Sequence, residues 1–156
     1  MEDFRLSTVD QVLEQIKGKK IGFTCSCFDI LHSGHVTMLE DAKSQCDILV
    51  VGLQTDPTLD RPEKNHPVQT FQERLIMINA VKYVDYIIKY TYEKELHELI
   101  QKLNPHIRIL GSDYIGKNFT GSDLNIPIYF HPRHLHTWST TLLRKRVWEA
   151  EQEKIK

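Results

Sequence analysis

Apolar residues in this chain follow two alternating patterns. Short runs of consecutive apolar residues are typical of strands in a sheet that is covered on both faces. The run Ile48–Leu53 is the clearest example. This pattern predicts five strands, which are Lys20–Cys25, Ile48–Leu53, Tyr86–Tyr90, Ile107–Leu110 and Ile126–Phe130.

Between these runs, apolar residues recur every three or four positions, which is the spacing of one helix face. A first helix is expected over about residues 9–16, with Ser7 or Thr8 as its cap and Gly18 after its end. Further helices are expected over about residues 33–46, 71–78 and 96–103, and from about Ser139 to near the C-terminus. The residues expected to face the core from the last helix are Leu143, Val147 and Ala150.

Strands that alternate with helices predict an α/β fold, in which a Rossmann-like, doubly wound, five-stranded parallel sheet carries helices on both faces. A chain of 156 residues suits one domain, so we expect residues 1–156 to form a single domain with residues 1–18 as an N-terminal helical extension. Residues 54–69 contain three prolines and many charges and are expected to form a long loop. Long loops in compact domains are often functional.

Composition and charge narrow the classes of function. The net charge is −1 at pH 7, so nothing in it favours binding to nucleic acid or to an anionic membrane. No apolar run is long enough to span a bilayer, and the acidic start Met1–Arg5 lacks a signal-peptide core, so we expect a cytoplasmic location. The odd number of cysteines, three, favours reduced thiols. Cys25 and Cys27 could form half of a metal site, but no second pair complements them.

A His-x-Gly-His sequence lies directly before the second predicted helix. If Ser33 caps that helix, Gly34 and His35 occupy its first turn, where unpaired N–H groups and the helix dipole favour an anion. His32 and His35 can then point the same way and donate hydrogen bonds to phosphate oxygens. Gly34 lets a phosphate approach the backbone. The alternative interpretation is a pair of surface or zinc-binding histidines.

A second polar cluster, Ser139–Arg144, opens the last predicted helix. Its hydroxyls can cap the helix or bind phosphate, and Arg144 lies one turn after Thr140 on the same face. A guanidinium matches phosphate in a bidentate geometry. The alternative is an ordinary capped helix with a basic surface.

Parallel α/β sheets bind ligands beyond the carboxyl ends of their strands. The His-x-Gly-His sequence follows the first strand, Gly111–Asp113 follow a later strand, and Arg133–Ser139 follow the last. The topology therefore predicts that three polar clusters converge on one cleft.

The combination of His-x-Gly-His with a later helix start rich in Ser and Thr resembles the nucleotidyltransferase superfamily. The closer resemblance is to glycerol-3-phosphate cytidylyltransferase-like proteins, and it extends from about Lys20 to Lys145. The segments that carry it are Phe28–His35, Glu73–Arg74, Tyr83–Asp85, Gly111–Asp113, Pro132–Arg133 and Ser139–Thr141.

The resemblance implies roles for the residues at matching positions. His32 and His35 would hold the triphosphate and stabilise the transition state, with Arg144 as a third catalytic residue. For Arg74, an ion pair on the helix surface is the alternative to a role in binding the acceptor. The implied nucleotide-binding residues are Cys27, Phe28, Gly34, Asp113, Arg133, Ser139 and Thr140. The implied acceptor-binding residues are Arg61, Lys64 and Arg74.

Three features depart from the cytidylyltransferase pattern. Ser26–Cys27 replaces Gly-Thr, Gly111–Tyr114 replaces a more acidic sequence that contains Trp, and Arg133–Ser139 is one residue longer. The last segment helps to select the base, so these departures leave both cytosine and adenine open.

The resemblance implies an in-line displacement in which an acceptor phosphate attacks the α-phosphorus of a nucleoside triphosphate and pyrophosphate leaves. Mg²⁺ would accompany the triphosphate. We expect CTP, a small phosphorylated polyol such as glycerol 3-phosphate, and a homodimer. One alternative is an adenylyltransferase that uses ATP with a sugar phosphate or flavin-type acceptor. The other is a non-catalytic module that binds nucleotide or metal through histidines, which are His32, His35, His131, His134 and His136.

Overall fold

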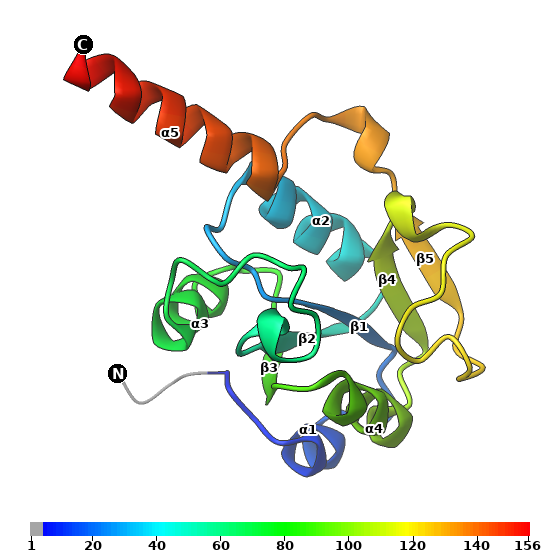
Figure 1. Ribbon diagram of the computed structural model, residues 1–156. Coiled ribbons are helices and arrows are strands. Elements are labelled where there is room, and N and C mark those ends of the chain that lie inside the picture. The colour runs from blue at the N-terminus through cyan, green and yellow to red at the C-terminus, as the bar shows by residue number, and fades with distance from the viewer. Residues whose placement is uncertain (1–4) are drawn as a thin grey trace.

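A fully parallel five-stranded sheet forms the centre of the computed structural model, which describes residues 5–156 (Figure 1). Its strands are β1 (Ile21–Ser26), β2 (Ile48–Gln54), β3 (Tyr86–Tyr90), β4 (Ile107–Gly111) and β5 (Ile128–His131). The order across the sheet is β3-β2-β1-β4-β5. All five predicted strands are confirmed, with ends that shift by up to two residues. The first residues of the acidic start, 1–4, lie outside the described part of the chain.

In the described part of the chain, five α-helices and three short 3₁₀ turns precede, connect or follow the strands. The helices are α1 (Val9–Gln15), α2 (Ser33–Ser44), α3 (Phe71–Asn79), α4 (Glu93–Leu103) and α5 (Thr140–Ile155). Thr8 caps α1, as one of the two predicted choices. Within residues 5–156, none of the helices has the length and hydropathy that crossing a membrane requires.

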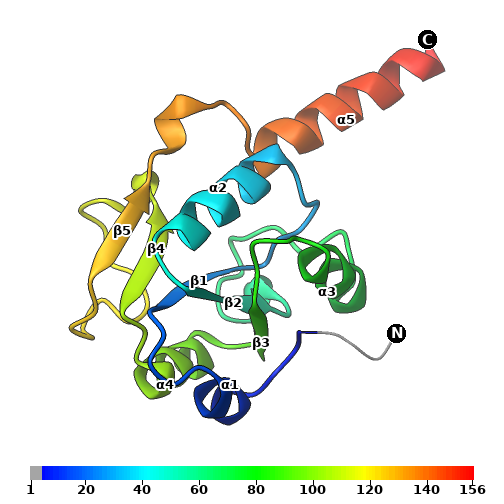
Figure 2. The same ribbon diagram turned by 180° about the vertical axis from the view of Figure 1, so that it is seen from behind.

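Helices cover both faces of the sheet, as predicted. On one face, α2 and α3 contribute Leu39 and Ile78 to a buried cluster with residues of β2, β3 and β4. On the other face, α1 and α4 contribute Val12 and Leu99 to a second cluster (Figure 2). The alternation of side chains along each strand supplies both clusters, which is why the strands read as nearly continuous apolar runs.

The strand register brings the functional loops to one edge. β1 and β2 pair along their length from Ile21 opposite Ile48 to Ser26 opposite Leu53, so the two strands end together. On the other side, Gly111 of β4 pairs with His131 of β5. The sheet order reverses at β1, so a crevice is expected beyond the carboxyl ends of β1 and β4.

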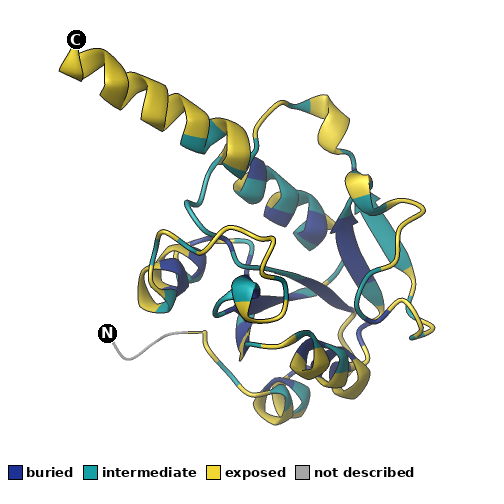
Figure 3. Ribbon diagram, viewed as in Figure 1, coloured by how far each residue is buried: buried dark blue, intermediate teal, exposed yellow. Residues whose placement is uncertain are grey.

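Helix α5 departs from the prediction. It extends away from the rest of the molecule, and most of it is exposed (Figure 3). Val147 and Trp148 are 55% and 64% exposed, so the expectation that Leu143, Val147 and Ala150 face the core is wrong for the helix as a whole. The helical spacing of apolar residues is real, but beyond its first turns the helix has no neighbouring element to pack against.

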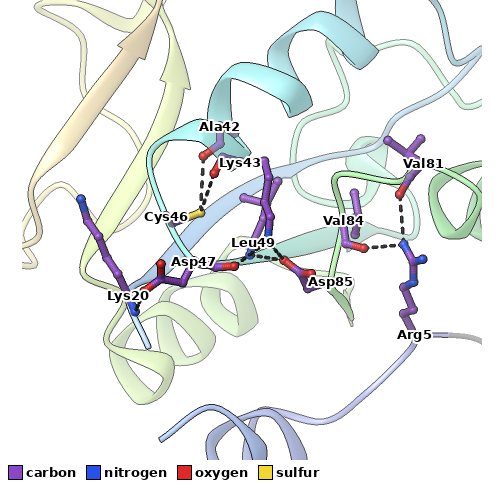
Figure 4. Close-up of polar contacts among 10 residues, drawn as sticks. All are labelled: Arg5, Lys20, Ala42, Lys43, Cys46, Asp47, Leu49, Val81, Val84 and Asp85. Atoms are coloured by element: carbon purple, nitrogen blue, oxygen red, sulfur yellow. Dashed lines mark hydrogen bonds and ion pairs between the residues drawn. The ribbon is translucent and has the colours of Figure 1, made fainter. Parts of the chain in front are cut away.

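A polar network closes the opposite, amino-terminal edge of the sheet (Figure 4). The carboxylate of Asp85 accepts hydrogen bonds from Lys43 Nζ at 2.6 Å and from the Leu49 backbone N–H at 2.7 Å. Arg5 donates to the carbonyl oxygens of Val81 and Val84. These contacts join the N-terminal segment, α2 and the start of β3, and they leave the carboxyl edge as the open side of the sheet.

Candidate active site

A cleft of about 840 Å³ lies at the carboxyl edge of the sheet. Residues from all three predicted polar clusters line it, together with part of the loop after β2. Among the predicted site residues, those that line the cleft are Cys27, Phe28, His32, Gly34, His35, Arg61, Lys64, Asp113, Arg133 and Thr140. The prediction that the three clusters converge is therefore confirmed.

A strained loop connects β1 to α2 and presents the histidines. Phe28 and Ile30 have φ angles of 50° and 48°, a left-handed region that residues other than Gly rarely adopt. Asp29 stabilises this loop, because its carboxylate accepts hydrogen bonds from the backbone N–H groups of Val68 and Gln69 at 2.9 and 3.0 Å. The Phe28 ring is buried and lies edge-on to His35, with ring centroids 5.4 Å apart. The site is thus held in shape before any ligand binds.

His32, rather than Ser33, is the N-cap of α2. Its Nδ1 accepts a hydrogen bond from the Gly34 backbone N–H at 3.1 Å. A neutral imidazole that accepts at Nδ1 carries its proton on Nε2. The cap therefore fixes the tautomer of His32 and leaves Nε2–H as the donor.

His35 repeats this arrangement one turn of the chain later. Its Nδ1 accepts from the His32 backbone N–H at 3.3 Å, and the two imidazoles stack with centroids 3.9 Å apart. Burial lowers the pKa of His35 to about 3, with His32 and Arg133 adding to the shift. Burial also lowers the pKa of His32. Near neutral pH both rings are uncharged and can each donate one N–H from Nε2.

Gly34 lies where two parts of the chain approach closely. A Cβ atom at this position would lie 2.9 Å from the backbone oxygen of Trp138 and 2.9 Å from Cε1 of His32. Only a residue without a side chain allows the first turn of α2 to meet the segment before α5. The expected role of Gly34, which is to let a phosphate approach the backbone, stays a prediction.

The start of α5 meets the histidines directly. Thr140 Oγ1 lies 3.0 Å from His32 Nε2, although 108 positions separate the two residues. Thr140 lines the cleft, whereas Ser139 turns its hydroxyl to cap α5 by accepting from the Leu142 N–H at 3.2 Å. The structure thus places the two hydroxyls in different environments. The resemblance implied that both bind the nucleotide, whereas Ser139 fills the capping role that the sequence also allowed.

Arg144 does not line the cleft. Its guanidinium lies 3.7 Å from the carboxylate of Asp29, in an ion pair between α5 and the β1–α2 loop. The arrangement suits a residue that holds α5 against the loop. The catalytic role that the resemblance implied for Arg144 stays a prediction.

Asp113 and Arg133 face each other across the end of β4 and β5. Their side chains form an ion pair at 3.3 Å, and the Arg133 N–H donates to Ser112 Oγ at 3.0 Å. Both residues line the cleft and are about half exposed. They are therefore accessible to a nucleotide, as expected, and a ligand could exchange for their mutual contact.

Arg61 and Lys64 line the cleft from the loop after β2. Arg61 forms an ion pair with Glu93 at 3.0 Å and donates to Gln54 Oε1 at 3.2 Å. Its Nε is buried and has no partner. The loop thus brings positive charge to the side of the cleft that lies away from α5.

Arg74 is placed differently from either interpretation of the sequence. It is 1% exposed, and its guanidinium donates to the carbonyl oxygens of Cys27, Gln54, Gln69 and Thr55. It is not a surface ion pair, and it does not line the cleft. Arg74 instead ties the β1–α2 loop to the loop after β2, because a buried guanidinium with several carbonyl partners acts as a rigid cross-link.

The sequence analysis gave His131 and His136 only to the non-catalytic alternative, but both line the cleft. His131 Nδ1–H donates to the carboxylate of Asp41 in α2 at 2.7 Å, and His136 stacks on Trp138 with centroids 5.1 Å apart. The signal was present for His136, since the sequence analysis singled out the segment Arg133–Ser139. Arg108 gave a weaker signal, a lone charged residue inside the apolar run of β4.

Within residues 5–156 no group of three or more His, Cys, Asp and Glu side chains is arranged to hold a metal ion. The cleft carboxylates are already engaged, Asp113 with Arg133 and Glu93 with Arg61. Cys25 and Cys27 are unpaired thiols, and burial raises the pKa of each. These thiols are therefore protonated near neutral pH and are poor metal ligands.

The sequence matches known proteins over most of its length. The family model described as cytidylyltransferase-like matches residues 23–146. The bifunctional protein HldE of Aliarcobacter butzleri is 36% identical over 136 residues, which cover 86% of this chain and 28% of that protein. HldE of Campylobacter curvus is 34% identical, over 92% of this chain and 31% of that protein. The chain therefore spans about a third of the length of these relatives.

Solved structures share the fold. The lipopolysaccharide core biosynthesis protein of Thermoplasma volcanium superposes with a TM-score of 0.60 at 28% identity, over 71% of this chain and 94% of that one. Pantoate–β-alanine ligase of Francisella tularensis superposes with a TM-score of 0.57 at 21% identity, over 81% of this chain and 66% of that one, and shows the fold alone.

Proposed function

Since the chain belongs to the cytidylyltransferase-like family of nucleotidyltransferases, we propose that it transfers the adenylyl group of ATP to the phosphate of a sugar phosphate. Pyrophosphate is the other product. The chain corresponds to about a third of the HldE proteins, so the proposal concerns this one reaction and no second activity.

The contact between His32 and Thr140 carries this proposal. It joins the His-x-Gly-His segment to the N-terminus of a 16-residue helix, at the edge of a parallel sheet. Both elements offer unpaired backbone N–H groups, and the helix ends carry partial positive charge. Two such ends around one cleft suit a chain of phosphates better than any neutral ligand.

The neutral histidines suit phosphoryl chemistry. The Nε2–H of His35, and that of His32 once it exchanges Thr140 for a phosphate, are oriented by contacts at Nδ1. They can stabilise the charge that builds up on the oxygens of the α-phosphorus during in-line attack. The attacking phosphate is already an anion near neutral pH, so the reaction needs positioning more than a strong base. The stacked rings supply that positioning, because their tautomers and orientations are fixed by the backbone.

Mg²⁺ fits this site as a cation that enters with the triphosphate. Such ions are held largely by phosphate oxygens and water, with few protein ligands. The described residues offer no dedicated cluster of carboxylates, and Asp113 is the cleft carboxylate on the nucleotide side. When bound, the ion would neutralise charge on the phosphates.

We favour ATP and a sugar phosphate over the CTP and glycerol 3-phosphate of our first expectation. The relationship to the HldE proteins supports this choice, and so does the likeness to a protein named for lipopolysaccharide core biosynthesis. The longer Arg133–Ser139 segment, which departs from the cytidylyltransferase pattern, is consistent with a different base.

A matrix of nucleotides and acceptors tests the proposal. Pyrophosphate release is measured with ATP or CTP against triose, hexose and heptose phosphates and glycerol 3-phosphate, in the presence of Mg²⁺. We expect turnover with ATP and a sugar phosphate, a heptose phosphate first among them. Turnover with CTP and glycerol 3-phosphate alone would restore the first expectation, and binding of nucleotide without turnover on any acceptor would favour a non-catalytic module.

A further inference from the structure

Arg108 is a buried arginine whose guanidinium lacks hydrogen-bond acceptors for some of its N–H groups. The residue is 2% exposed, yet it lines the cleft. Its Nη1 donates to the carbonyl oxygen of Thr120, its Nη2 has only the sulfur of Cys25 at 4.0 Å, and its buried Nε has no partner. No carboxylate among residues 5–156 forms an ion pair with it.

Arg74 provides an internal comparison. It is equally buried, but all three of its guanidinium nitrogens donate to backbone carbonyl oxygens, and it does not line the cleft. Buried arginines normally donate to carboxylates or carbonyl oxygens, because an unpaired buried charge is costly. Every guanidinium nitrogen of Arg74 has an acceptor within the protein, as expected of a structural residue, whereas Nε of Arg108 has none.

The neighbours of Arg108 do not neutralise it. Burial raises the pKa of the Cys25 thiol, so that thiol is uncharged near neutral pH. Phe119 covers the guanidinium face at 5.1 Å from Cζ, which leaves the edge of the group available. The Glu93 carboxylate is engaged with Arg61 at 3.0 Å and with Thr120 Oγ1 at 2.6 Å.

The Nε and Nη2 edge of the Arg108 guanidinium suits a particular kind of ligand. Nε–H and one Nη2–H of a guanidinium point in parallel, and this fork matches the two oxygens of a carboxylate or phosphate. With Arg61 and Lys64 on the same cleft and Glu93 as the only carboxylate beside them in its lining, this region carries excess positive charge. A group with two anionic oxygens suits it better than a single hydroxyl.

Arg108 lies on a different side of the sheet from the histidines. Its strand neighbour Ile109 packs into the cluster beneath α2, so the alternation of side chains turns Arg108 toward the face covered by α4. Within residues 5–156, the contacts of Arg108 (Cys25, Phe119 and Thr120) and those of the histidine pair share no residue. A ligand that reaches both must present two separate groups.

We propose that the Nε and Nη2 edge of Arg108 binds a second oxyanion of the acceptor, a phosphate or carboxylate remote from the phosphate that attacks ATP. The identification of the ligand as the acceptor rests on the proposed function, whereas the oxyanion subsite itself does not. It narrows the acceptor to doubly anionic compounds, such as a sugar bisphosphate or a phosphorylated sugar acid.

Binding of inorganic phosphate tests the subsite without any turnover. The full chain is titrated calorimetrically and its crystals are soaked with phosphate, for the wild type, Arg108→Met and the control Lys94→Gln, which removes an exposed cation from α4. We expect phosphate on the Arg108 edge in the wild type and the control, and one site fewer in Arg108→Met. The same number of sites in all three proteins, or an empty Arg108 edge in soaked crystals, overturns the proposal.

Arg108→Lys guards against misfolding of the methionine variant. It keeps the charge but loses the parallel fork, so phosphate affinity at this subsite should fall about tenfold or more while the protein stays folded. Unchanged affinity in a folded Arg108→Lys protein would overturn the bidentate assignment.

Kinetics with matched acceptors test which anion is bound. A sugar 1-phosphate is compared with the corresponding sugar bisphosphate, with ATP as donor. We expect the wild type to prefer the bisphosphate, and Arg108→Met to raise KM for the bisphosphate about tenfold to a hundredfold while kcat and the monophosphate KM stay unchanged. Equal losses on both acceptors would assign Arg108 to the attacking phosphate and overturn the inference. If no acceptor is turned over, the proposed function fails while the phosphate-binding result still decides the subsite.

Discussion

His32 Nε2 and Thr140 Oγ1 lie 3.0 Å apart and join the first turn of α2 to the first turn of α5. The backbone N–H of Gly34 occupies the other ring nitrogen of His32, so Nε2 is the nitrogen that carries the proton. The hydroxyl of Thr140 therefore accepts a hydrogen bond from the imidazole, and its own O–H can donate to a phosphate oxygen.

Thr140→Val tests this relationship with little change in shape. The variant loses the hydroxyl that both orients His32 and faces the cleft, so kcat/KM for the triphosphate should fall about tenfold. Steady-state pyrophosphate release measures the effect. Thr141→Val, at the exposed next position, is the control and should behave as the wild type.

His35→Ala should cost more, because His35 is expected to donate to the reacting phosphate itself. By analogy with the loss of one oxyanion donor, turnover should fall by roughly two to three orders of magnitude. His134→Ala, on an exposed residue outside the cleft lining, is the control. Unchanged kinetics in a folded His35→Ala protein would contradict the role given to this ring.

Gly34→Ala tests the close approach of α2 to the segment before α5. The added Cβ would lie 2.9 Å from the Trp138 backbone oxygen, so the two elements must move apart. Since a displacement of about 1 Å can cost about a hundredfold in rate, we expect kcat/KM to fall by about that factor. Ser33→Ala, one position earlier and exposed, should have little effect, and circular dichroism should show both variants folded.

The histidine pair should make stability depend on pH. Burial lowers the pKa of His35 to about 3 in the folded protein, against about 6.5 when unfolded. Between these values the unfolded state binds the extra proton, so the contribution of His35 is fully present above about pH 6.5 and is lost as pH falls toward 3. The free energy of unfolding should therefore decrease with falling pH by up to about 1.4 kcal/mol per unit from this residue.

Urea denaturation at pH 7.5, 6 and 5 measures this slope. His35→Gln should unfold with a smaller dependence on pH than the wild type, whereas His134→Gln should keep the wild-type slope. An identical slope in His35→Gln and the wild type would show that His35 titrates alike in both states.

Arg74 should matter for stability. Arg74→Met removes the donor from four carbonyl oxygens and should lower the free energy of unfolding by about 3–5 kcal/mol. Chemical denaturation measures the change, with the exposed Lys82→Met as control. A stable Arg74→Met protein with a raised acceptor KM would return Arg74 to the acceptor-binding role implied by the resemblance.

The sequence determined the layout of this protein. Runs such as Ile48–Leu53 and the helical stripes predicted every strand and helix to within a few residues, because burial on both faces of a parallel sheet leaves a strong local signal. The same signal placed His32 and His35 at the carboxyl edge, since in a parallel sheet the residues after a strand always lie there.

Only the tertiary structure decided which polar groups meet and which are buried. Nothing local in the sequence distinguishes Thr140, which reaches His32, from Ser139, which caps its own helix. Arg74 and Arg108 carry the same charge, yet the structure gives every guanidinium nitrogen of Arg74 an acceptor and leaves Nε of Arg108 without one at the cleft. The apolar spacing of α5 predicts a buried face that it does not have, because burial needs a neighbour, and a neighbour is a property of the whole fold.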